Sequence, residues 1–189
     1  MNYLERLTNT QNRKPENLAA GISSMILEIR KENIKQSLSD INTVGHRQDY
    51  VGTIDGVMYY DDSRAENVNA TWFTFENIVR PVVWIAGGND RNTDFSELKP
   101  VARKNVRALV CIGKDNDKLL RTFGDDIAEI VVAQSIGDAV KQASRLAEED
   151  DIVLFSPACR SDRAESFETR GKRFIASVKK LENERHQKQ

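Results

Sequence analysis

The sequence of 189 residues contains few of the side chains on which secreted proteins and metalloenzymes depend. It has two cysteines, Cys111 and Cys159, and both lie in or beside apolar runs typical of strands. We therefore expect reduced, structural thiols and a cytoplasmic location. No group of His, Cys and carboxylate residues has metal-ligand spacing, so we expect no metal site made by this chain.

Charge and hydropathy disfavour two classes of partner. The 28 Lys and Arg residues are balanced by 29 Asp and Glu residues, which gives a formal net charge of −1. This balance lacks the positive surface that nucleic acids and anionic membranes attract. No apolar run approaches the roughly 20 residues that cross a bilayer. The first residues also lack the apolar centre of a secretory signal. We expect neither a nucleic acid nor a membrane as partner.

Several familiar catalytic motifs are missing as well. The sequence contains no Gly-x-x-x-x-Gly-Lys-Ser/Thr phosphate loop, no Gly-x-Gly-x-x-Gly dinucleotide fingerprint and no Gly-x-Ser-x-Gly elbow. Its only histidines are His46 and His186, so a hydrolase triad would have to use His46. The chain therefore shows no self-contained catalytic machinery.

What the sequence does contain is the pattern of an α/β fold. Asp55-Gly56 separates two strand-like runs and predicts a hairpin. Beyond the hairpin, apolar runs alternate with helical patterns, with strands expected at 82–86, 106–112, 127–132 and 152–155 and helices at 66–79, 116–123, 136–148 and 164–181. Continuous apolar strands separated by helices are typical of a parallel sheet covered on both faces. We predict a mostly parallel, Rossmann-like sheet of about six strands, after an N-terminal helical remnant and before a frayed, charged tail at 182–189.

Two segments stand where a strand should end and a helix begin. One is Asp62-Ser63-Arg64-Ala65-Glu66-Asn67, and the other is Ser156-Pro157-Ala158-Cys159-Arg160-Ser161. In an open α/β sheet, ligands bind at the carboxyl ends of strands and the amino ends of helices. The fold can bring the two segments to one edge of the sheet, so they form the candidate functional site.

These motifs resemble those of the Mur ligases, the ATP-dependent amino-acid ligases of peptidoglycan synthesis. Residues 156–161 resemble the family string Ser-Pro-Ala-Cys-Ala-Ser, and Asp62-Ser63-Arg64 resembles Asp-Ser-Lys. Phe167, Arg170 and Gly171 match Phe-x-x-Arg-Gly. The Asp-Asn-Pro-Arg string of diaminopimelate-adding relatives does not occur. The sequence looks most like the D-glutamate-adding branch of the family, as found in Bacteroidetes-type bacteria.

The resemblance implies a domain organisation. Residues 46–181 correspond to the C-terminal domain of such a ligase, and residues 1–45 to the helical end of its central ATPase domain. The N-terminal UDP-binding domain and most of the central domain are not represented. The phosphate loop and the Mg²⁺ ligands would belong to these missing ligase domains, so the chain alone would not be competent.

The resemblance also implies roles for individual residues. Arg47 and Asp62 would contact ATP, and Arg64 would face the reacting phosphate as a catalytic residue. The incoming amino acid would be held by three residues: Arg91, Ser161 and Phe167. The implied substrates are D-glutamate and UDP-N-acetylmuramoyl-L-alanine, a UDP-muramoyl peptide.

The chain departs from the family pattern at four positions. Arg64 and Arg91 stand where the family has lysine, Glu66 stands at a threonine position and Arg160 replaces a small residue. Arginine is bulkier than lysine and forked, so the exchange is not conservative in a close-fitting site. The segment Asn12-Arg13-Lys14-Pro15-Glu16 also departs from a His-Asn-x-x-Asn motif of the family. Together with Glu66 and Arg160, it favours a competing hypothesis, in which the chain is a non-catalytic binding or interaction module derived from the same fold.

Each of these residues also has a purely structural interpretation. Asp62 could cap the helix that follows it, and Ser156 and Ser161 could both be helix caps. Gly87-Gly88 could merely let the chain turn after a strand. Arg64 could be a solvated surface charge, and Phe167 could belong to the core.

Overall fold

The computed structural model describes residues 48–88, 93–113, 116–160 and 165–187. Four features predicted from the sequence lie outside these residues. They are the N-terminal helical remnant and the candidate site residues Arg47, Arg91 and Ser161.

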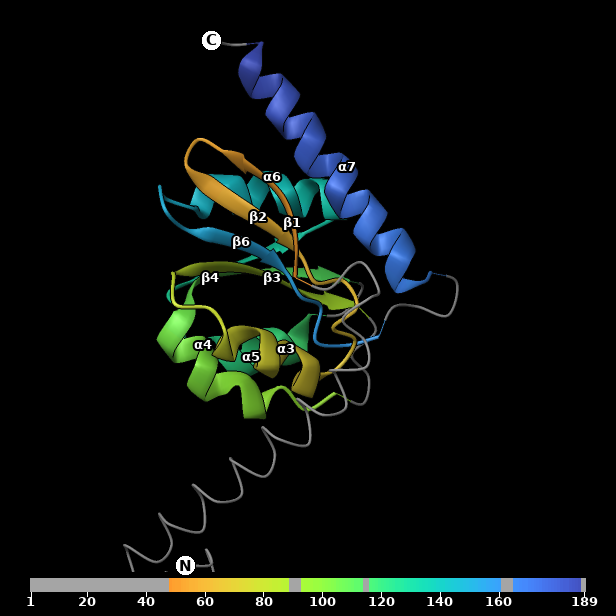
Figure 1. Ribbon diagram of the computed structural model, residues 1–189. Coiled ribbons are helices and arrows are strands. Elements are labelled where there is room, and N and C mark those ends of the chain that lie inside the picture. The colour runs from red at the N-terminus through yellow and green to blue at the C-terminus, as the bar shows by residue number, and fades with distance from the viewer. Residues whose placement is uncertain (1–47, 89–92, 114–115, 161–164, 188–189) are drawn as a thin grey trace, which may run out of the picture. The chain divides into compact units, whose positions relative to one another are not determined.

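A six-stranded sheet forms the centre of the described domain (Figure 1). Its strands are β1 (Asp49–Ile54), β2 (Val57–Asp61), β3 (Val82–Gly88), β4 (Val106–Gly113), β5 (Glu129–Ala133) and β6 (Ile152–Phe155). The strand order is β1-β2-β6-β3-β4-β5, and only the β1–β2 pair is antiparallel. The predicted mostly parallel α/β sheet is therefore confirmed.

The antiparallel pair is the predicted hairpin. Ile54 lies opposite Val57, and the two residues between them, Asp55 and Gly56, have φ angles of 50° and 79°. Positive φ at both central positions is the geometry that matches the twist of a tight hairpin. The Asp-Gly pair in the sequence predicted this turn correctly.

Helices cover both faces of the sheet (Figure 1). One face carries α3 (Val68–Glu76), a 3-10 turn η1 (Ser96–Leu98), α4 (Lys99–Asn105) and α5 (Asp117–Phe123); the other carries α6 (Ile136–Leu146) and α7 (Phe167–His186). On the first face, the buried ring of Trp84 packs edge-on against Phe75 and Phe123. On the second, Phe155 of β6 packs against Phe174 of α7. Both layers are thus anchored on strands at the centre of the sheet.

The last helix is longer than predicted. It continues to His186, into the segment expected to be a frayed tail, and that expectation is wrong. Arg185 Nε lies 3.3 Å from Asp55 Oδ2 in the hairpin turn, so the helix end has a tertiary partner. The Glu, Lys and Arg residues of this segment are also good helix formers.

Candidate functional site

The two predicted segments meet at the carboxyl edge of the sheet. The backbone N–H of Asp62 donates to Phe155 O at 2.8 Å, and the N–H of Ala158 donates to Ala65 O at 2.9 Å. Because β2 and β6 are adjacent parallel strands, the loops that leave them run side by side. The segments that are far apart in the sequence therefore form one surface, as predicted.

A buried hydrogen-bond network fixes these loops to each other. Asp62 Oδ2 accepts one hydrogen bond from Ser156 Oγ at 2.8 Å and another from Thr74 Oγ1 of α3 at 2.7 Å. The indole Nε1 of Trp84 donates to Ser156 O at 2.7 Å. Asp62, Ser156 and Thr74 have no exposed surface. The network thus ties both loops to the core and gives the site a rigid floor.

The helix caps at this edge are different residues from those considered in the sequence. Asn67 Oδ1 accepts from Ala70 N–H at 2.9 Å and caps α3. Ser166 Oγ accepts from Thr169 N–H at 3.3 Å and caps α7. The interpretation of Asp62 and Ser156 as helix caps is therefore wrong, because their side chains bond across the loop contact instead.

The Gly87-Gly88 pair is required by close packing at the end of β3. Gly87 has φ 114°, and a Cβ added to it would clash with the backbone carbonyl of Ile112 in β4. Gly88 has φ 153°, and a Cβ there would lie 2.8 Å from Arg160 O and 3.1 Å from Arg170 Nη1. These contacts support the structural interpretation of the glycines.

Two of the predicted site residues contact each other. Arg64, which is half-buried in the loop after β2, stacks over the ring of Phe167 at the start of α7, with Cζ 5.3 Å from the ring centroid. A guanidinium over an aromatic face is held by electrostatic attraction and loses part of its rotamer freedom. Arg64 is therefore more than a freely solvated surface charge, and Phe167, which is half-buried, faces this residue.

Arg170 is a site residue for which no role was predicted from the sequence. Its guanidinium is buried, with Nη2 3.0 Å from Glu66 Oε1 and 3.5 Å from Ser63 O. Burial lowers the pKa of Arg170, and the charge of Glu66 opposes that shift. Its place one turn into the helix after Phe167 was visible in the sequence. Its burial was not, because a charged residue at the start of a helix is usually solvated.

Comparison with known proteins identifies this domain. A family model described as "Mur ligase, glutamate ligase domain" matches residues 46–159. The chain belongs to the Mur ligase family.

The curated relatives of this Mur ligase domain are D-glutamate ligases. The chain is 42% identical over 165 residues to the UDP-N-acetylmuramoylalanine–D-glutamate ligase of Salinibacter ruber. This match covers 87% of this chain and 36% of the relative. It is 39% identical over 165 residues to the enzyme of the same name from Christiangramia forsetii, with 87% and 37% covered. The chain thus spans about a third of the length of the relatives that it matches.

A solved structure was also found among the similar folds. UDP-N-acetylmuramate-alanine ligase of Thermotoga maritima is 14% identical with a TM-score of 0.43, and the match covers 73% of this chain and 31% of that one.

The Mur ligase domain brings together three of the residues predicted from the sequence. Asp62 lies in the buried floor, and Arg64 and Phe167 lie in contact above the loops. Arg47, Arg91 and Ser161 lie outside the described residues, so their roles stay predictions. Both cysteines are buried and neither is in a disulfide within the described residues, and burial raises the pKa of Cys111 to about 12.

The described residues contain neither a metal-ligand cluster nor a membrane-spanning helix. They contain no group of three or more His, Cys, Asp and Glu side chains placed to hold a metal ion. None of their helices combines the length and the apolar character that crossing a bilayer requires.

Proposed function

We propose that this chain is the C-terminal domain of an ATP-dependent ligase that joins D-glutamate to UDP-N-acetylmuramoyl-L-alanine in the cytoplasm. The observation that carries the proposal is the stacking of Arg64 on Phe167 where the two loops meet. The identity of about two-fifths to D-glutamate ligases supports the choice of amino acid. The other domains of the ligase would supply the phosphate loop and the Mg²⁺ site.

The geometry around Arg64 suits a ligation that passes through an acyl phosphate. Attack by an amine places negative charge on the tetrahedral intermediate and on the departing phosphate. A cation that is already oriented stabilises this charge without reorganising during the reaction. Phe167 limits the orientations of the Arg64 guanidinium, and the Asp62 network holds the loop that carries it.

The nucleotide contact predicted for Asp62 finds less support in the described residues. The Asp62 side chain is fully buried, and Oδ2 already accepts two hydroxyl hydrogen bonds. A ribose could reach this carboxylate only if the loops moved apart, so the residues as they stand do not fit the nucleotide. ATP, when bound to the complete ligase, would supply the phosphoryl group that activates the substrate carboxylate.

A chimeric ligase tests the proposed function. Residues 46–187 of this chain would replace the matching C-terminal part of the Salinibacter ruber enzyme, and phosphate release would be measured with and without D-glutamate. We expect D-glutamate-dependent release, and Arg64→Ala should lower its rate about 100-fold or more. The control is Arg121→Ala, which removes an arginine from the exposed surface of α5 and should leave the rate unchanged.

The same experiment addresses the competing hypothesis of a non-catalytic module. The ion pair between Arg170 and Glu66 favours that hypothesis, because it neutralises a cation at the site without any ligand. A correctly folded chimera that releases no phosphate in the presence of D-glutamate would contradict the ligase and support the module.

A further inference from the structure

The least satisfied polar side chain at this edge of the sheet is that of Arg170. It is 3% exposed, and Nη2 has the two contacts already described, with Glu66 Oε1 and Ser63 O. Within the described residues, Nε and Nη1 have no hydrogen-bond partner. A buried cation is costly unless it is paired and its donors are used. Arg170 therefore has more donors than the protein satisfies.

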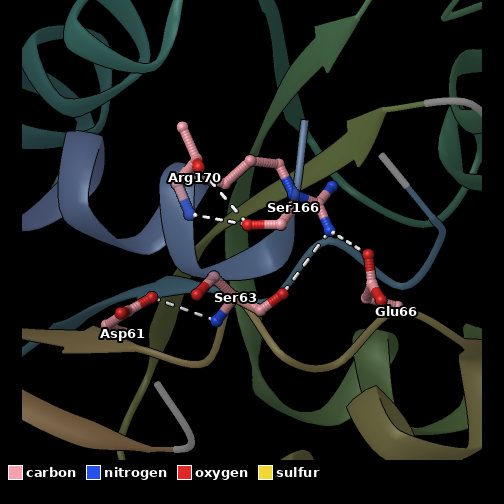
Figure 2. A network of polar contacts seen from close by, with 6 residues as sticks. Asp61, Ser63, Glu66, Ser166 and Arg170 are labelled. Atoms are coloured by element: carbon pink, nitrogen blue, oxygen red, sulfur yellow. Dashed lines mark hydrogen bonds and ion pairs between the residues drawn. The ribbon is translucent and has the colours of Figure 1, made fainter. Parts of the chain in front are cut away.

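The surroundings of Arg170 are those of a small polar site. Figure 2 shows its guanidinium beside the carbonyl oxygen of Ser63 and the carboxylate of Glu66, both in the loop after β2. Ser63 Oγ is buried, and no hydrogen-bond partner for it is present in the described part of the chain. Gly88 at the end of β3 presents no side chain toward Nη1. The two N–H groups of Arg170 without partners thus lie at the strand ends, where open α/β sheets bind ligands.

The chemistry of these donors selects a carboxylate. The planar fork of an arginine matches the two oxygens of a carboxylate and can donate to both. One carboxylate of the protein already contacts this guanidinium. Glu66 Oε1 lies 3.0 Å from Nη2 of Arg170. Glu66 is 30% exposed, whereas Arg170 is 3% exposed and is held by the first turns of α7.

We propose that Glu66 is a tethered carboxylate that competes with a carboxylate of the incoming amino acid for Arg170. In this arrangement, Nε and Nη1 of Arg170 form the carboxylate subsite, and Glu66 sets how tightly an anionic amino acid binds there. The inference deepens the proposed function and rests on it for the identity of the ligand. The competition itself requires only a carboxylate ligand.

Competition from Glu66 would weaken the binding of a ligand carboxylate to Arg170. A ligand carboxylate must displace Glu66 from Arg170. The loss of the Glu66 contact offsets part of the free energy gained from the ligand contact. Replacing Glu66 with glutamine removes the charge that contacts Nη2 of Arg170 and competes with a ligand carboxylate. We expect D-glutamate to bind about tenfold more tightly to Glu66→Gln, as one charge-assisted contact allows. Glu66→Thr should act in the same direction.

The experiment compares the 189-residue chain with three variants, Glu66→Gln, Glu66→Thr and Glu129→Gln. Glu129 is an exposed residue of the edge strand β5, so its variant removes the same charge away from the site. D-glutamate and, separately, sodium formate are titrated while the ¹⁵N signal of the Arg170 Nε–H group is followed by NMR. The amide spectrum of each variant reports whether it is folded.

The inference is supported if both Glu66 variants bind more tightly than the unchanged chain and Glu129→Gln, and if the Arg170 signal moves on binding. It is overturned if D-glutamate binds all four proteins equally, or if binding leaves the Arg170 signal in place. A further outcome separates it from the proposed function. If D-glutamate binds none of the proteins but formate moves the Arg170 signal in the Glu66 variants, the subsite stands and the choice of amino acid fails. If formate leaves that signal unmoved as well, the subsite fails too.

Discussion

The two edges of the parallel sheet use the same pair of side-chain types in opposite ways. At the amino edge the buried partner is a carboxylate: Asp151, just before β6, is 1% exposed and accepts from Arg107 Nε at 2.7 Å. It also accepts from the backbone N–H of Glu148 at 2.9 Å. At the carboxyl edge the buried partner is the cation, Arg170, and its carboxylate, Glu66, is the more exposed group.

This reversal separates an interaction that stabilises the fold from one that awaits a ligand. Arg107 is 36% exposed, so its charge stays partly solvated while it satisfies Asp151. Arginine can do this because its long stem reaches past the buried group to water. Arg170 has no such access, and two of its donors lack partners among the described residues. An ion pair therefore indicates function only where burial leaves part of it unsatisfied.

The largest effect is expected at the amino edge. Asp151→Asn keeps the shape of the side chain but removes the charge that Arg107 neutralises, and we expect the free energy of unfolding to fall by about 2 kcal/mol. The matched control is Asp150→Asn, one residue earlier, where the side chain is 82% exposed and pairs with Arg80 on the surface. That change should cost no more than about 0.5 kcal/mol. Urea denaturation at pH 7 measures both. Equal losses would mean that burial does not decide the worth of these pairs.

A smaller, pH-dependent effect is expected at Asp126, in the turn between α5 and β5. Its carboxylate contacts Arg103 Nε at 2.8 Å and Lys99 Nζ at 3.0 Å. Mainly the bond from Arg103, and then that from Lys99, lowers the pKa of Asp126 in the folded chain. A carboxylate with a depressed folded pKa stabilises the fold above its unfolded pKa of about 3.9 and loses this contribution as the pH falls through the folded value.

The unchanged chain should accordingly be more stable than Asp126→Asn at pH 7 and pH 5, and the difference should be smaller at pH 3. Thermal unfolding at the three pH values measures it. A difference that stays constant down to pH 3 would show that the ion pairs are not its source.

Much of the fold was predictable because its signals are local. The Asp55-Gly56 turn carries its conformation in two residues, and the apolar run at 152–155 coincides with β6. The candidate segments were also predictable, because parallel strands place their carboxyl ends at one edge. The family resemblance, in turn, singled out Arg64 and Phe167, which the structure brings into contact.

What the sequence could not reveal depends on contacts between distant residues. The hydrogen bonds from Thr74 and Ser156 to Asp62 join α3, the loop after β6 and the loop after β2. No spacing in the sequence indicates these contacts. The burial of Arg170 depends in the same way on loops that arrive from elsewhere. The extension of α7 to His186 was missed for a similar reason, since Asp55 is its partner.

The smallest effect on stability is expected at the carboxyl edge, and it decides whether the two edges really differ. Arg170→Met keeps most of the buried apolar volume and removes a cation whose Nε and Nη1 have no partner in the described part of the chain. Replacing a poorly satisfied buried charge with an apolar side chain is often neutral. Glu66, which is partly exposed, can then be solvated. We expect the free energy of unfolding to change by less than about 1 kcal/mol, well below the loss for Asp151→Asn.

Urea denaturation measures this change beside Arg173→Met, which removes an exposed arginine from the next turn of α7 and should also have little effect. If Arg170→Met costs as much as Asp151→Asn, the buried cation holds the fold together in the way that Asp151 does. If it costs as little as Arg173→Met, the fold does not depend on that charge. The subsite then remains as the physical reason for placing a cation where water cannot reach it.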